Sequence, residues 1–493
     1  MAANEGDGKN ELQTKLKEEA NELYKEHKIQ EAIDKYSEAI EVGGDNAIIF
    51  SNRALCWLRL DMNGAAMEDA VKAIKTDPQY AKGYYRRGSA RYGLGKYKLA
   101  LQDFTTTCKL MPKSKAARER MKECKKTVDR VNFERAIEME EPKPPSECVE
   151  LDNIPLESDF KGTEMPWPLT EEYVRQLMQD FKDQKSMRRR HMYQLLLGVL
   201  EILKAEKAFN HITMPDEAPD GTDTTKPLSE PHVVVWGDLH GQYYDMLHIF
   251  ESVGLPGKGR RMLFNGDYVD RGSFSCEVIL TLFALKTLYP KYVHLNRGNH
   301  ETTNMNRVYG FAGEVKAKYG GNAYDLFREI FNYLPLGHII ENKVFVVHGG
   351  LPREDGVKLQ ELEQIDRVRE PGDPSYMADV LWSDPSPLTG RQMSKRGIGM
   401  SFGPDVTTRF LAENNLELVI RSHEVKPEGY EVAHSGKCIT VFSAPNYCDE
   451  MGNKSAVVRL KKDCKPEFLQ FTHVPHPNIR PMAYTSGGGM FGF

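Results

Sequence analysis

Hydrophobic and polar positions at the start of the chain recur with a step of 34 residues. In that step Ala20 maps to Ala54 and then to Gly88. Small residues therefore recur where two paired helices would touch, and larger apolar residues recur where they would fill the groove. Pro78 and Pro112 follow the second and third units, where a helix would have to stop. The pattern predicts three stacked pairs of helices.

The stretch after the repeats changes character twice. A long polar helix is expected over residues 114–136, because the last unit of a stack needs a solvated outer face. The run from Glu138 to Pro145 is acidic and then rich in proline, which is typical of a linker. A wide apolar face between Tyr193 and Leu203 then predicts helical structure. We expect a repeat domain, a linker, a second domain and a tail at residues 10–136, 137–167, 168–475 and 476–493.

Six short apolar runs in the second domain predict buried β-strands, because most are rich in β-branched or aromatic residues. The runs are His232–Trp236, Met262–Phe264, Tyr292–Leu295, Val344–Val347, Leu418–Ile420 and Ile439–Phe442. They alternate with longer mixed segments, which is typical of an α/β domain. The chain is therefore predicted to be a multidomain protein, with an all-α superhelix followed by an α/β domain.

Five of these strands end in a polar cluster that an apolar core would not tolerate. Ligand sites in open α/β sheets lie where strands run out into loops, and glycines there permit tight turns and close backbone approach. The clusters are Gly237–Gly241, Gly266–Gly272, Gly298–Glu301, His348–Gly350 and Arg421–Glu424.

Composition narrows the class of protein. Apolar residues make up 40% of the 493 residues, enough for a buried core, and the net charge of -5 gives no reason to expect nucleic acid as a partner. The eight cysteines are scattered without a CxxC pair, and no secretory signal or membrane-spanning apolar run is visible. We therefore expect a cytoplasmic protein, with nuclear entry left open by the basic cluster Arg188–Arg190, and a monomer.

The residue types in the five clusters suit hard or borderline divalent metals, because Asp, His and Asn supply oxygen and imidazole nitrogen. Two metals close together need a carboxylate that can bridge them. The order of the motifs resembles the metallophosphoesterase superfamily, which implies a central β-sandwich flanked by helices and two divalent ions, manganese or of the iron and zinc type. The resemblance implies that Asp238 and His240 hold the first metal and that Asp267 bridges the two metals. It implies that Asn299, His348 and His423 hold the second metal.

Two motifs narrow the resemblance. The run Gly266–Gly272, followed by Arg297–Glu301, is similar to the serine/threonine phosphoprotein phosphatases. Purple acid phosphatases would carry a tyrosine ligand at Asp270 and a second histidine at Val425, and both are missing. Protein substrates are therefore favoured. A phosphatase of small molecules or nucleotides on the same metal core stays open, as does a chaperone-bound scaffold with an inactive catalytic domain.

The family resemblance implies hydrolysis of phosphoserine and phosphothreonine by a hydroxide that two metals activate. The Ser or Thr oxygen leaves poorly unless it is protonated, and His300 is the candidate acid, with Asp270 orienting its imidazole. Arg271 and Arg396 are implied to grip the phosphate oxygens, a task that suits a planar bidentate donor. Tyr447 would lie over the site from a late loop. The implied substrate-binding residues are Arg271, Asn299, Arg396 and Tyr447.

The helical units resemble tetratricopeptide repeats, and their polar inner positions resemble the carboxylate clamp of chaperone-binding repeat domains. In the 34-residue frame five side chains can face one groove, namely Lys17, Asn21, Asn52, Lys82 and Arg86. Lysines and asparagines that converge in this way suit a C-terminal carboxylate. The alternative is a solvated concave face. The resemblance implies docking onto the Glu-Glu-Val-Asp tail of the ninety-kilodalton heat-shock chaperone.

A phosphatase of this kind with N-terminal repeats is also implied to be autoinhibited, with the repeats folded over the active site until a chaperone tail or a fatty acid releases them. Family members usually follow a Pro-Met-Ala-Tyr stretch with a short apolar helix. Here Pro481–Tyr484 is followed by Thr485–Met490, whose three glycines make a helix unfavourable. We therefore expect autoinhibition to be weaker, or to use other contacts.

Overall fold

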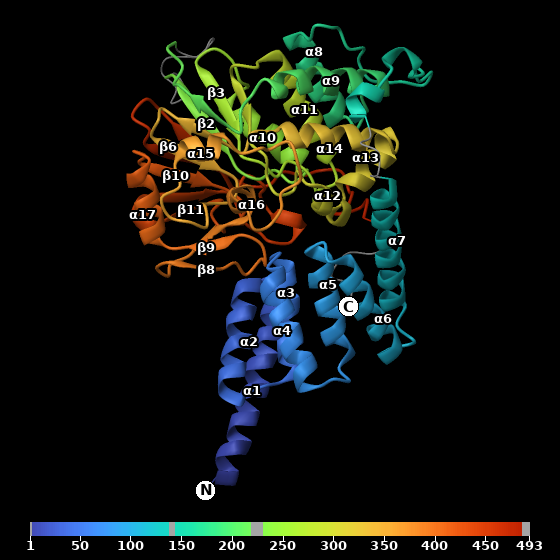
Figure 1. The fold of residues 1–493 in the computed structure, drawn as a ribbon, viewed down its shortest axis with the longest axis vertical. Coiled ribbons are helices and arrows are strands. Elements are labelled where there is room, and N and C mark those ends of the chain that lie inside the picture. The colour runs from blue at the N-terminus through green and yellow to red at the C-terminus, as the bar shows by residue number, and fades with distance from the viewer. Residues whose placement is uncertain (1, 138–142, 218–229, 486–493) are drawn as a thin grey trace. The chain divides into compact units, whose positions relative to one another are not determined.

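The computed structural model describes residues 2–137, 143–217 and 230–485 of the chain. They form two compact units (Figure 1). The first unit consists of Met1–Pro142, Ser394–Ile398 and Thr485–Phe493, and the second of Lys143–Met393 and Gly399–Tyr484. The glycine-rich tail after Thr485 lies outside the described residues, as does the acidic start of the expected linker. No helix in the described ranges is long and apolar enough to cross a membrane.

The first unit is all-α, and its helices keep the step of 34 residues that the sequence predicts. The second helix of each pair begins at Ile29, Asn63 and Tyr97, and these starts are 34 residues apart. The helices are α1 (Ala2–Lys25), α2 (Ile29–Gly43), α3 (Ala47–Arg59), α4 (Asn63–Thr76), α5 (Ala81–Gly93), α6 (Tyr97–Leu110) and α7 (Lys115–Ile137). The prediction of an all-α repeat superhelix is confirmed.

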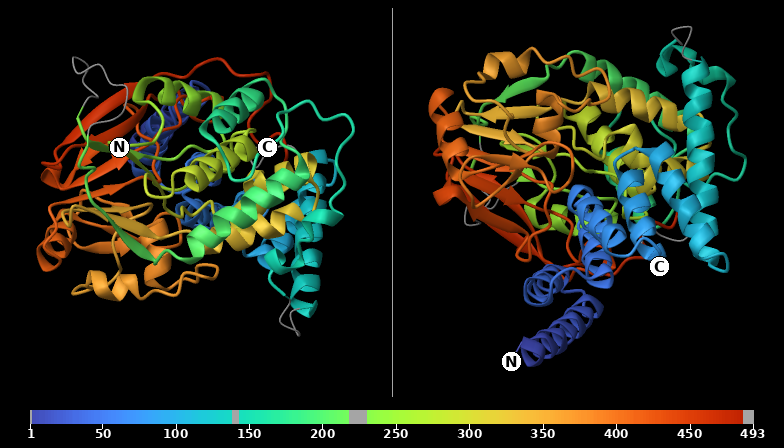
Figure 2. Two further views of the ribbon diagram at one scale, coloured as in Figure 1. Left: turned by 90° about the horizontal axis from the view of Figure 1, so that it is seen from above. Right: turned by 60° about the horizontal axis from the view of Figure 1, so that its bottom comes forward.

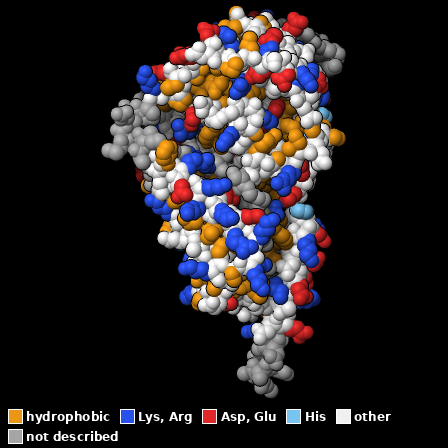
Figure 3. All heavy atoms as spheres, turned by 90° about the vertical axis from the view of Figure 1, so that its right-hand side faces the viewer, with side chains coloured by type: hydrophobic (Ala, Val, Ile, Leu, Met, Phe, Trp, Pro, Cys, Tyr) orange, Lys and Arg blue, Asp and Glu red, His pale blue; other side chains and the backbone are white. Residues whose placement is uncertain are grey.

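Small residues let the paired helices approach one another. Ala20 and Ala54 are completely buried, and at the third equivalent position a Cβ on Gly88 would collide with the ring of Phe104. Helix α7 closes the stack, and its Arg120 guanidinium lies 4.4 Å from the centre of the Tyr92 ring. Basic and acidic side chains are both visible on the side of the molecule that Figure 3 shows, as a solvated outer face requires.

The second unit is built on two sheets that pack face to face. The six-stranded sheet has the order β1-β5-β6-β10-β12-β11, and the five-stranded sheet has the order β14-β13-β2-β3-β4. The strands of the first are β1 (Phe209–Ile212), β5 (Gly337–Ile340), β6 (Val344–Val347), β10 (Leu418–Arg421), β11 (Tyr430–Ala433) and β12 (Cys438–Val441). Those of the second are β2 (His232–Trp236), β3 (Arg260–Phe264), β4 (Val293–Leu295), β13 (Ser455–Leu460) and β14 (Pro466–Phe471). A small third sheet has the order β7 (Asp384–Pro385), β9 (Met400–Phe402) and β8 (Arg391–Met393).

Strand β2 shows why the sandwich has two cores. Val233 and Val235 pack between the sheets, whereas Val234 and Trp236 pack against helices on the outer face. Successive side chains of a strand point to opposite faces, so a strand covered on both faces must be apolar throughout. Most helices of this unit gather on one side of the strands (Figure 2). The helices described in this unit are α8 (Glu171–Lys182), α9 (Arg189–Lys204), α10 (Tyr243–Val253), α11 (Ser275–Leu288), α12 (Thr303–Tyr309), α13 (Phe311–Tyr319), α14 (Ala323–Tyr333), α15 (Leu359–Glu363), α16 (Tyr376–Trp382) and α17 (Pro404–Glu413). Of these, α15 and α17 pack instead beside β1 and β10 of the six-stranded sheet.

All six apolar runs form strands, and the α/β sandwich flanked by helices is confirmed. The sequence did not reveal β13, although every residue of β13 is buried. Its apolar run is interrupted by Arg459, which is only 5% exposed and whose Nε donates to Glu467 over 2.8 Å. Glu467 lies on the neighbouring strand β14, so only the folded sheet provides the partner that lets a buried arginine sit there.

Residues 143–167, expected as a linker, belong by their contacts to the second unit. They include the short helical turns η1 (Pro145–Cys148) and η2 (Leu151–Asn153). The backbone N–H and the hydroxyl of Ser146 donate to Glu329 on α14 over 2.8 and 2.7 Å. These two bonds attach the stretch to the helical layer of the second unit.

Candidate metal centre and active site

The five polar clusters meet at one edge of the sandwich. Strands β2, β3 and β4 are parallel, and so are β6 and β10, so the carboxyl ends within each set lie at the same edge. Each cluster begins within three residues of the end of its strand, and the loops bring side chains from both sheets together.

Asp267 lies at the centre of the resulting cluster. Its carboxylate Oδ2 is 3.6 Å from Nε2 of His240 and 3.3 Å from Nε2 of His348. Two groups of three potential ligand atoms each lie within 4.8 Å of one another, the first from His240, Asp267 and His300, the second from Asp267, His348 and His423. Asp267 belongs to both groups, which is the position that a carboxylate needs to bridge two cations.

The two remaining predicted ligands, Asp238 and Asn299, lie in the same cluster. Oδ2 of Asp238 is 3.7 Å from Nε2 of His240, and its Oδ1 accepts a hydrogen bond from the backbone N–H of His423 over 3.0 Å. The side-chain amide of Asn299 lies 2.9 Å from Nε2 of His348. The structure thus brings all six predicted ligands together, and each is at most 7% exposed.

Two of the three predicted histidine ligands are oriented as metal ligands would be. Nδ1 of His240 lies 3.1 Å from the Val269 carbonyl, and Nδ1 of His348 lies 2.8 Å from the Asn265 carbonyl. A ring nitrogen that faces a carbonyl carries the proton, so Nε2 of each ring presents its lone pair to the cluster. Lone pairs of imidazole, carboxylate and amide therefore face one another in a buried space, an arrangement that a divalent cation stabilises.

The pKa shifts in the cluster also fit a site for divalent cations. Burial raises the pKa of Asp238 to about 7, opposed by His348 and assisted by the negative charge of Asp267. Burial and the positive charges of His300 and Arg271 hold the pKa of His240 well below its usual range. Two cations would offset the repulsion between the carboxylates and favour their ionised forms.

Several of the site residues have left-handed backbone conformations that non-glycine residues rarely adopt. Their φ angles are 43° for His240, 51° for Asp267, 72° for Asp270, 71° for Arg271 and 70° for His423. Each such conformation costs free energy and persists because the surrounding contacts leave no alternative. A Cβ on Gly298 would collide with the backbone and the carboxylate of Asp267, so this loop needs glycine at that position.

His300 and Asp270, the predicted acid and its orienting carboxylate, form a buried pair. Nδ1 of His300 lies 2.9 Å from Oδ2 of Asp270, which is 0% exposed. Asn306 on α12 donates to the same oxygen over 3.1 Å and to the His300 carbonyl over 2.6 Å, and the Phe311 N–H donates to the other oxygen over 2.9 Å. The sequence did not single out Asn306, because its role depends on how α12 packs over the loop.

Glu301 is a second functional residue that the sequence left without a role. Its carboxylate accepts hydrogen bonds from the backbone N–H groups of Asp267, Tyr268 and Gly298, at 2.8 to 2.9 Å. Burial, with the repulsion of Asp267, raises the pKa of Glu301 to about 8. Glu301 therefore holds the loop that carries the shared aspartate against the loop that carries Asn299.

Two predicted substrate-binding residues border the cluster. The Arg271 guanidinium stacks on the Tyr309 ring at 3.9 Å from its centre, and the Tyr447 ring lies 5.1 Å from that of His240. Arg396 lies in Ser394–Ile398, which belongs to the first compact unit, so its place at the phosphate stays a prediction.

The C-terminal segment of the second unit runs beside Arg271. The Met482 N–H donates to the Arg271 carbonyl over 2.7 Å, and the Met482 sulfur lies 3.9 Å from Nη1 of the guanidinium. Farther back, the Val474 N–H donates to the buried Asp245 carboxylate over 2.9 Å. The segment is therefore anchored at two points of the second unit.

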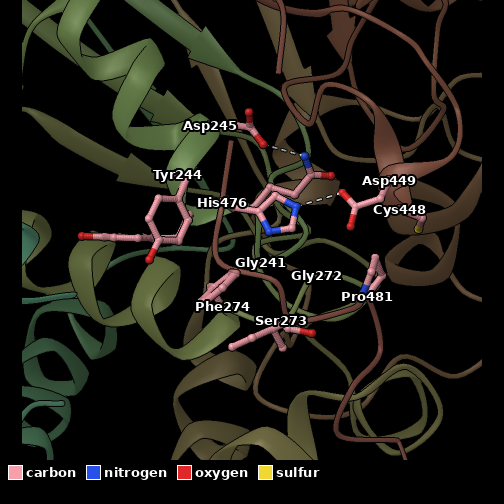
Figure 4. A pocket seen from close by; sticks show the side chains of 13 residues that line it. Gly241, Tyr244, Asp245, Gly272, Ser273, Phe274, Cys448, Asp449, His476 and Pro481 are labelled. Carbon is pink, nitrogen blue, oxygen red and sulfur yellow. Dashed lines mark hydrogen bonds and ion pairs between the residues drawn. The ribbon is translucent and has the colours of Figure 1, made fainter. Parts of the chain in front are cut away.

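A small cavity lies between this segment and the catalytic loops (Figure 4). Its lining includes Gly241, Gly272 and Cys448, each of which directly follows a predicted site residue. Two other lining residues form an ion pair, in which Nε2 of His476 lies 3.1 Å from Oδ1 of Asp449. This ion pair ties the C-terminal segment to the loop that carries Tyr447.

In the first unit, two of the five predicted clamp residues touch. The Asn52 side chain on α3 donates to Oδ1 of Asn21 on α1 over 3.1 Å. The Tyr36 hydroxyl donates to the same oxygen over 2.6 Å. Two polar side chains from different repeats thus share one groove, as the 34-residue frame predicts.

The other three clamp residues are cationic. Lys17 and Lys82 are partly exposed, and neither forms an ion pair within the described part of the chain. Burial lowers the pKa of Arg86, whereas the nearby Tyr85 and Tyr24 raise it. Within the described residues the two lysines therefore carry positive charges without a carboxylate at ion-pair distance.

Comparisons with known proteins match both parts of the chain. A family model described as calcineurin-like phosphoesterase matches residues 231–427, which hold all six predicted metal ligands. A second model, described as the PPP5 TPR repeat region, matches residues 121–211. That stretch runs from α7 to β1 and joins the repeats to the sandwich.

Whole proteins are similar over nearly the full length. Serine/threonine-protein phosphatase 5 of Homo sapiens is 48% identical over 97% of this chain and 94% of its own length. Serine/threonine-protein phosphatase T of Trypanosoma brucei brucei is 47% identical over 97% of this chain and 98% of its own. A solved protein serine/threonine phosphatase from Saccharomyces cerevisiae is 36% identical, covers 64% of this chain and all of its own, and has a TM-score of 0.59. The similarity therefore includes the helical repeats as well as the metal cluster.

Proposed function

The chain belongs to the serine/threonine-protein phosphatase 5 family, and from this premise we propose how its own residues hydrolyse phosphoserine and phosphothreonine in proteins. Family membership makes it a protein phosphatase with a metallophosphoesterase domain that uses divalent metal ions. The finer proposal is a two-metal centre built around Asp267. It is carried by the position of this carboxylate, which belongs to both groups of potential ligand atoms.

We assign one cation to the side of the cluster with His240 and the other to the side with His348. The proposed ligands are Asp238 and His240 for the first, Asp267 as the bridge, and Asn299, His348 and His423 for the second. Carboxylate, amide and imidazole donors suit manganese as well as an iron and zinc pair. When bound, the two cations supply Lewis acidity and lower the pKa of water toward neutrality.

His300 supplies the proton that the leaving serine or threonine oxygen needs. Asp270 holds Nδ1–H of the ring, so Nε2 carries the transferable proton. The carboxylate also favours the charged imidazolium, as an acid near neutral pH requires. Asn306 and the Phe311 N–H occupy the carboxylate as well, so Asp270 cannot turn away from the histidine.

Arg271 binds the phosphate. Its guanidinium lies on the Tyr309 ring, which restrains the guanidinium plane before substrate binds. A restrained planar donor loses little freedom when it grips two phosphate oxygens. Tyr447 and Arg396 complete the proposed phosphate site.

The C-terminal segment controls access to Arg271. The Met482 thioether lies against the guanidinium, where it competes with a phosphate oxygen. Ser273, two residues after Arg271, donates to the Arg480 carbonyl over 2.7 Å and holds the segment in place. We propose that this contact acts together with autoinhibition by the repeat domain, which a chaperone tail or a fatty acid relieves.

The repeat groove recruits a chaperone through its C-terminal tail. Asn21 and Asn52 meet in the groove, and Lys17 and Lys82 add positive charge without acidic partners among the described residues. A peptide ending in Glu-Glu-Val-Asp offers a main-chain carboxylate and acidic side chains to this set. The proposed partner is therefore the C-terminal tail of the ninety-kilodalton heat-shock chaperone.

The experiment that tests this proposal is phosphopeptide hydrolysis with added Mn²⁺, with and without a Glu-Glu-Val-Asp peptide. Asp267→Asn should reduce both turnover and bound metal, whereas Asp463→Asn, a change at an exposed carboxylate, should leave both unchanged. No turnover by the wild-type chain in either condition would sink the enzyme proposal. Turnover that a saturating peptide does not change would sink the coupling to the repeat domain.

A further inference from the structure

Three buried polar side chains form a hydrogen-bonded chain inside the sandwich: Asn265, Asn296 and His338. Nδ1 of His338 lies 2.6 Å from Oδ1 of Asn296, and Nδ2 of Asn296 donates to Oδ1 of Asn265 over 2.7 Å. All three residues are 0% exposed. They touch neither substrate nor, by the assignment above, metal, so the catalytic mechanism does not use them directly.

This chain of hydrogen bonds joins the two sheets. Asn265 and Asn296 directly follow β3 and β4 of the five-stranded sheet, whereas His338 lies on β5 of the six-stranded sheet. The side-chain amide of Asn265 then donates to the Val347 carbonyl at the end of β6, over 2.8 Å, and to the Ser422 hydroxyl after β10, over 2.9 Å. The polar chain therefore reaches three strands of the opposite sheet.

Each of these contacts lies next to a proposed metal ligand. Val347 precedes His348, and Ser422 precedes His423. The Asn265 carbonyl also accepts the Nδ1–H of His348, over 2.8 Å. The shared aspartate follows Asn265 two residues later in the sequence. One polar chain thus connects the ligand loops of both sheets.

Stability alone does not account for a polar chain at this position. The side chains that pack between the sheets around it, such as Ile340 and Val346, are aliphatic. Burial lowers the pKa of His338 to about 3, so the ring is neutral, and its Nε2 makes no hydrogen bond to the described residues. A buried polar group of this kind costs free energy, and such networks are retained where they favour one geometry.

We propose that Asn265, Asn296 and His338 are positioning residues of the metal centre. They hold the two sheets in the one alignment in which ligands from both sheets meet around the shared aspartate. This inference rests on the proposed two-metal function and deepens it. It predicts that breaking the hydrogen bonds among these three residues lowers the affinity for metal more than it lowers the melting temperature or the rate of the chemical step.

The test compares variants of the full-length protein in which these hydrogen bonds are removed or kept. N296L/H338L removes both partners of one bond and replaces them with apolar groups, as the surrounding core would accept. His338→Gln keeps an amide donor that can reach Asn296. His211→Leu, on β1 of the same sheet and with a side chain that is 48% exposed, is the control. His338→Leu serves if the double variant does not fold.

Mn²⁺ binding to the metal-free protein is measured by titration calorimetry, beside the Mn²⁺ dependence of turnover and the melting temperature without metal. N296L/H338L should bind Mn²⁺ about 10–100-fold more weakly. Its turnover should recover at saturating Mn²⁺, because the residues that perform the chemistry are unchanged. His338→Gln and His211→Leu should bind Mn²⁺ like the wild type.

The outcomes separate the inference from the function on which it rests. A wild-type chain that binds no Mn²⁺ overturns both. A wild type that binds two ions, beside a folded double variant with the same affinity, overturns the inference alone. The inference is also overturned if the double variant and His338→Gln lose Mn²⁺ affinity to the same extent and their melting temperatures fall in parallel. That result would show a purely structural role.

Discussion

Replacing His300 with asparagine separates two roles that its position allows. The ring rests on Asp270 as an acid would, with 2.9 Å between Nδ1 and the carboxylate. It also offers a ligand atom within 4.8 Å of those of His240 and Asp267, as a metal ligand would. An acid delivers a proton to the leaving group, whereas a ligand holds a cation. The two roles therefore predict different dependences on the leaving group.

The expected size of the effect follows from the surroundings of the pair. General acid catalysis contributes about 10²–10⁴ in rate, or about 3–5 kcal/mol of transition-state stabilisation. Asp270 is completely buried and accepts three hydrogen bonds, so the histidine is held in one orientation. We expect His300→Asn to lower turnover of a phosphoserine peptide by about 10²–10⁴. Turnover of p-nitrophenyl phosphate should fall by less than about tenfold, because nitrophenolate leaves without a proton.

The assay measures turnover of both substrates at saturating Mn²⁺, together with the metal content of the protein. His248→Asn, at a histidine whose side chain is 37% exposed, is the matched control and should resemble the wild type. Equal losses for the two substrates would refute the assignment of His300 as the acid. If bound metal fell in parallel, the same result would identify His300 as a ligand.

Three further predictions concern access and recruitment. Met482→Ala should raise basal phosphopeptide turnover about two- to tenfold, because a contact with Arg271 comparable to a hydrogen bond of about 0.5–1.5 kcal/mol is lost; unchanged steady-state kinetics would contradict it. Burial alone would lower the pKa of His476, but hydrogen bonds to the Pro477 carbonyl and to Asp449 raise this pKa above 6.5. The ion pair between His476 and Asp449 is therefore fully formed below pH 6.5 and is lost as the pH rises through the raised pKa. His476→Gln should therefore increase basal turnover more at about pH 6 than at about pH 9, and a pH-independent increase would rule this out. Lys82→Ala should weaken binding of a fluorescent Glu-Glu-Val-Asp peptide about 10–100-fold while leaving turnover without peptide unchanged. Anisotropy titration measures the peptide affinity of the wild type and of the variant.

Those features that depend on short-range pattern could be predicted from the sequence. The helix starts at Asn63 and Tyr97 keep the 34-residue step, because each repeat buries the same positions against its neighbour. The strand β2 was predicted to the residue, since a strand covered on both faces is apolar throughout. Strand β13 was missed because Arg459 is neutralised by a residue on another strand.

The predicted ligand residues were recognisable because each follows a strand in a short motif. Their neighbours were not, because those contacts join segments far apart in the chain. Asn306 supports Asp270 only because α12 packs over its loop, and Glu301 binds Asp267 only because two loops touch. Nothing in a short window of sequence indicates either contact.

The sequence by itself determined the repeat step, the strand set at the centre of the sandwich and the polar clusters that follow those strands, since all three are encoded in local spacing and residue type. Tertiary structure alone decided the left-handed backbone at His240 and Asp267, the contact of Met482 with Arg271 and the polar chain that ends at His338. These features cost free energy locally and exist only where packing from distant segments holds them in place.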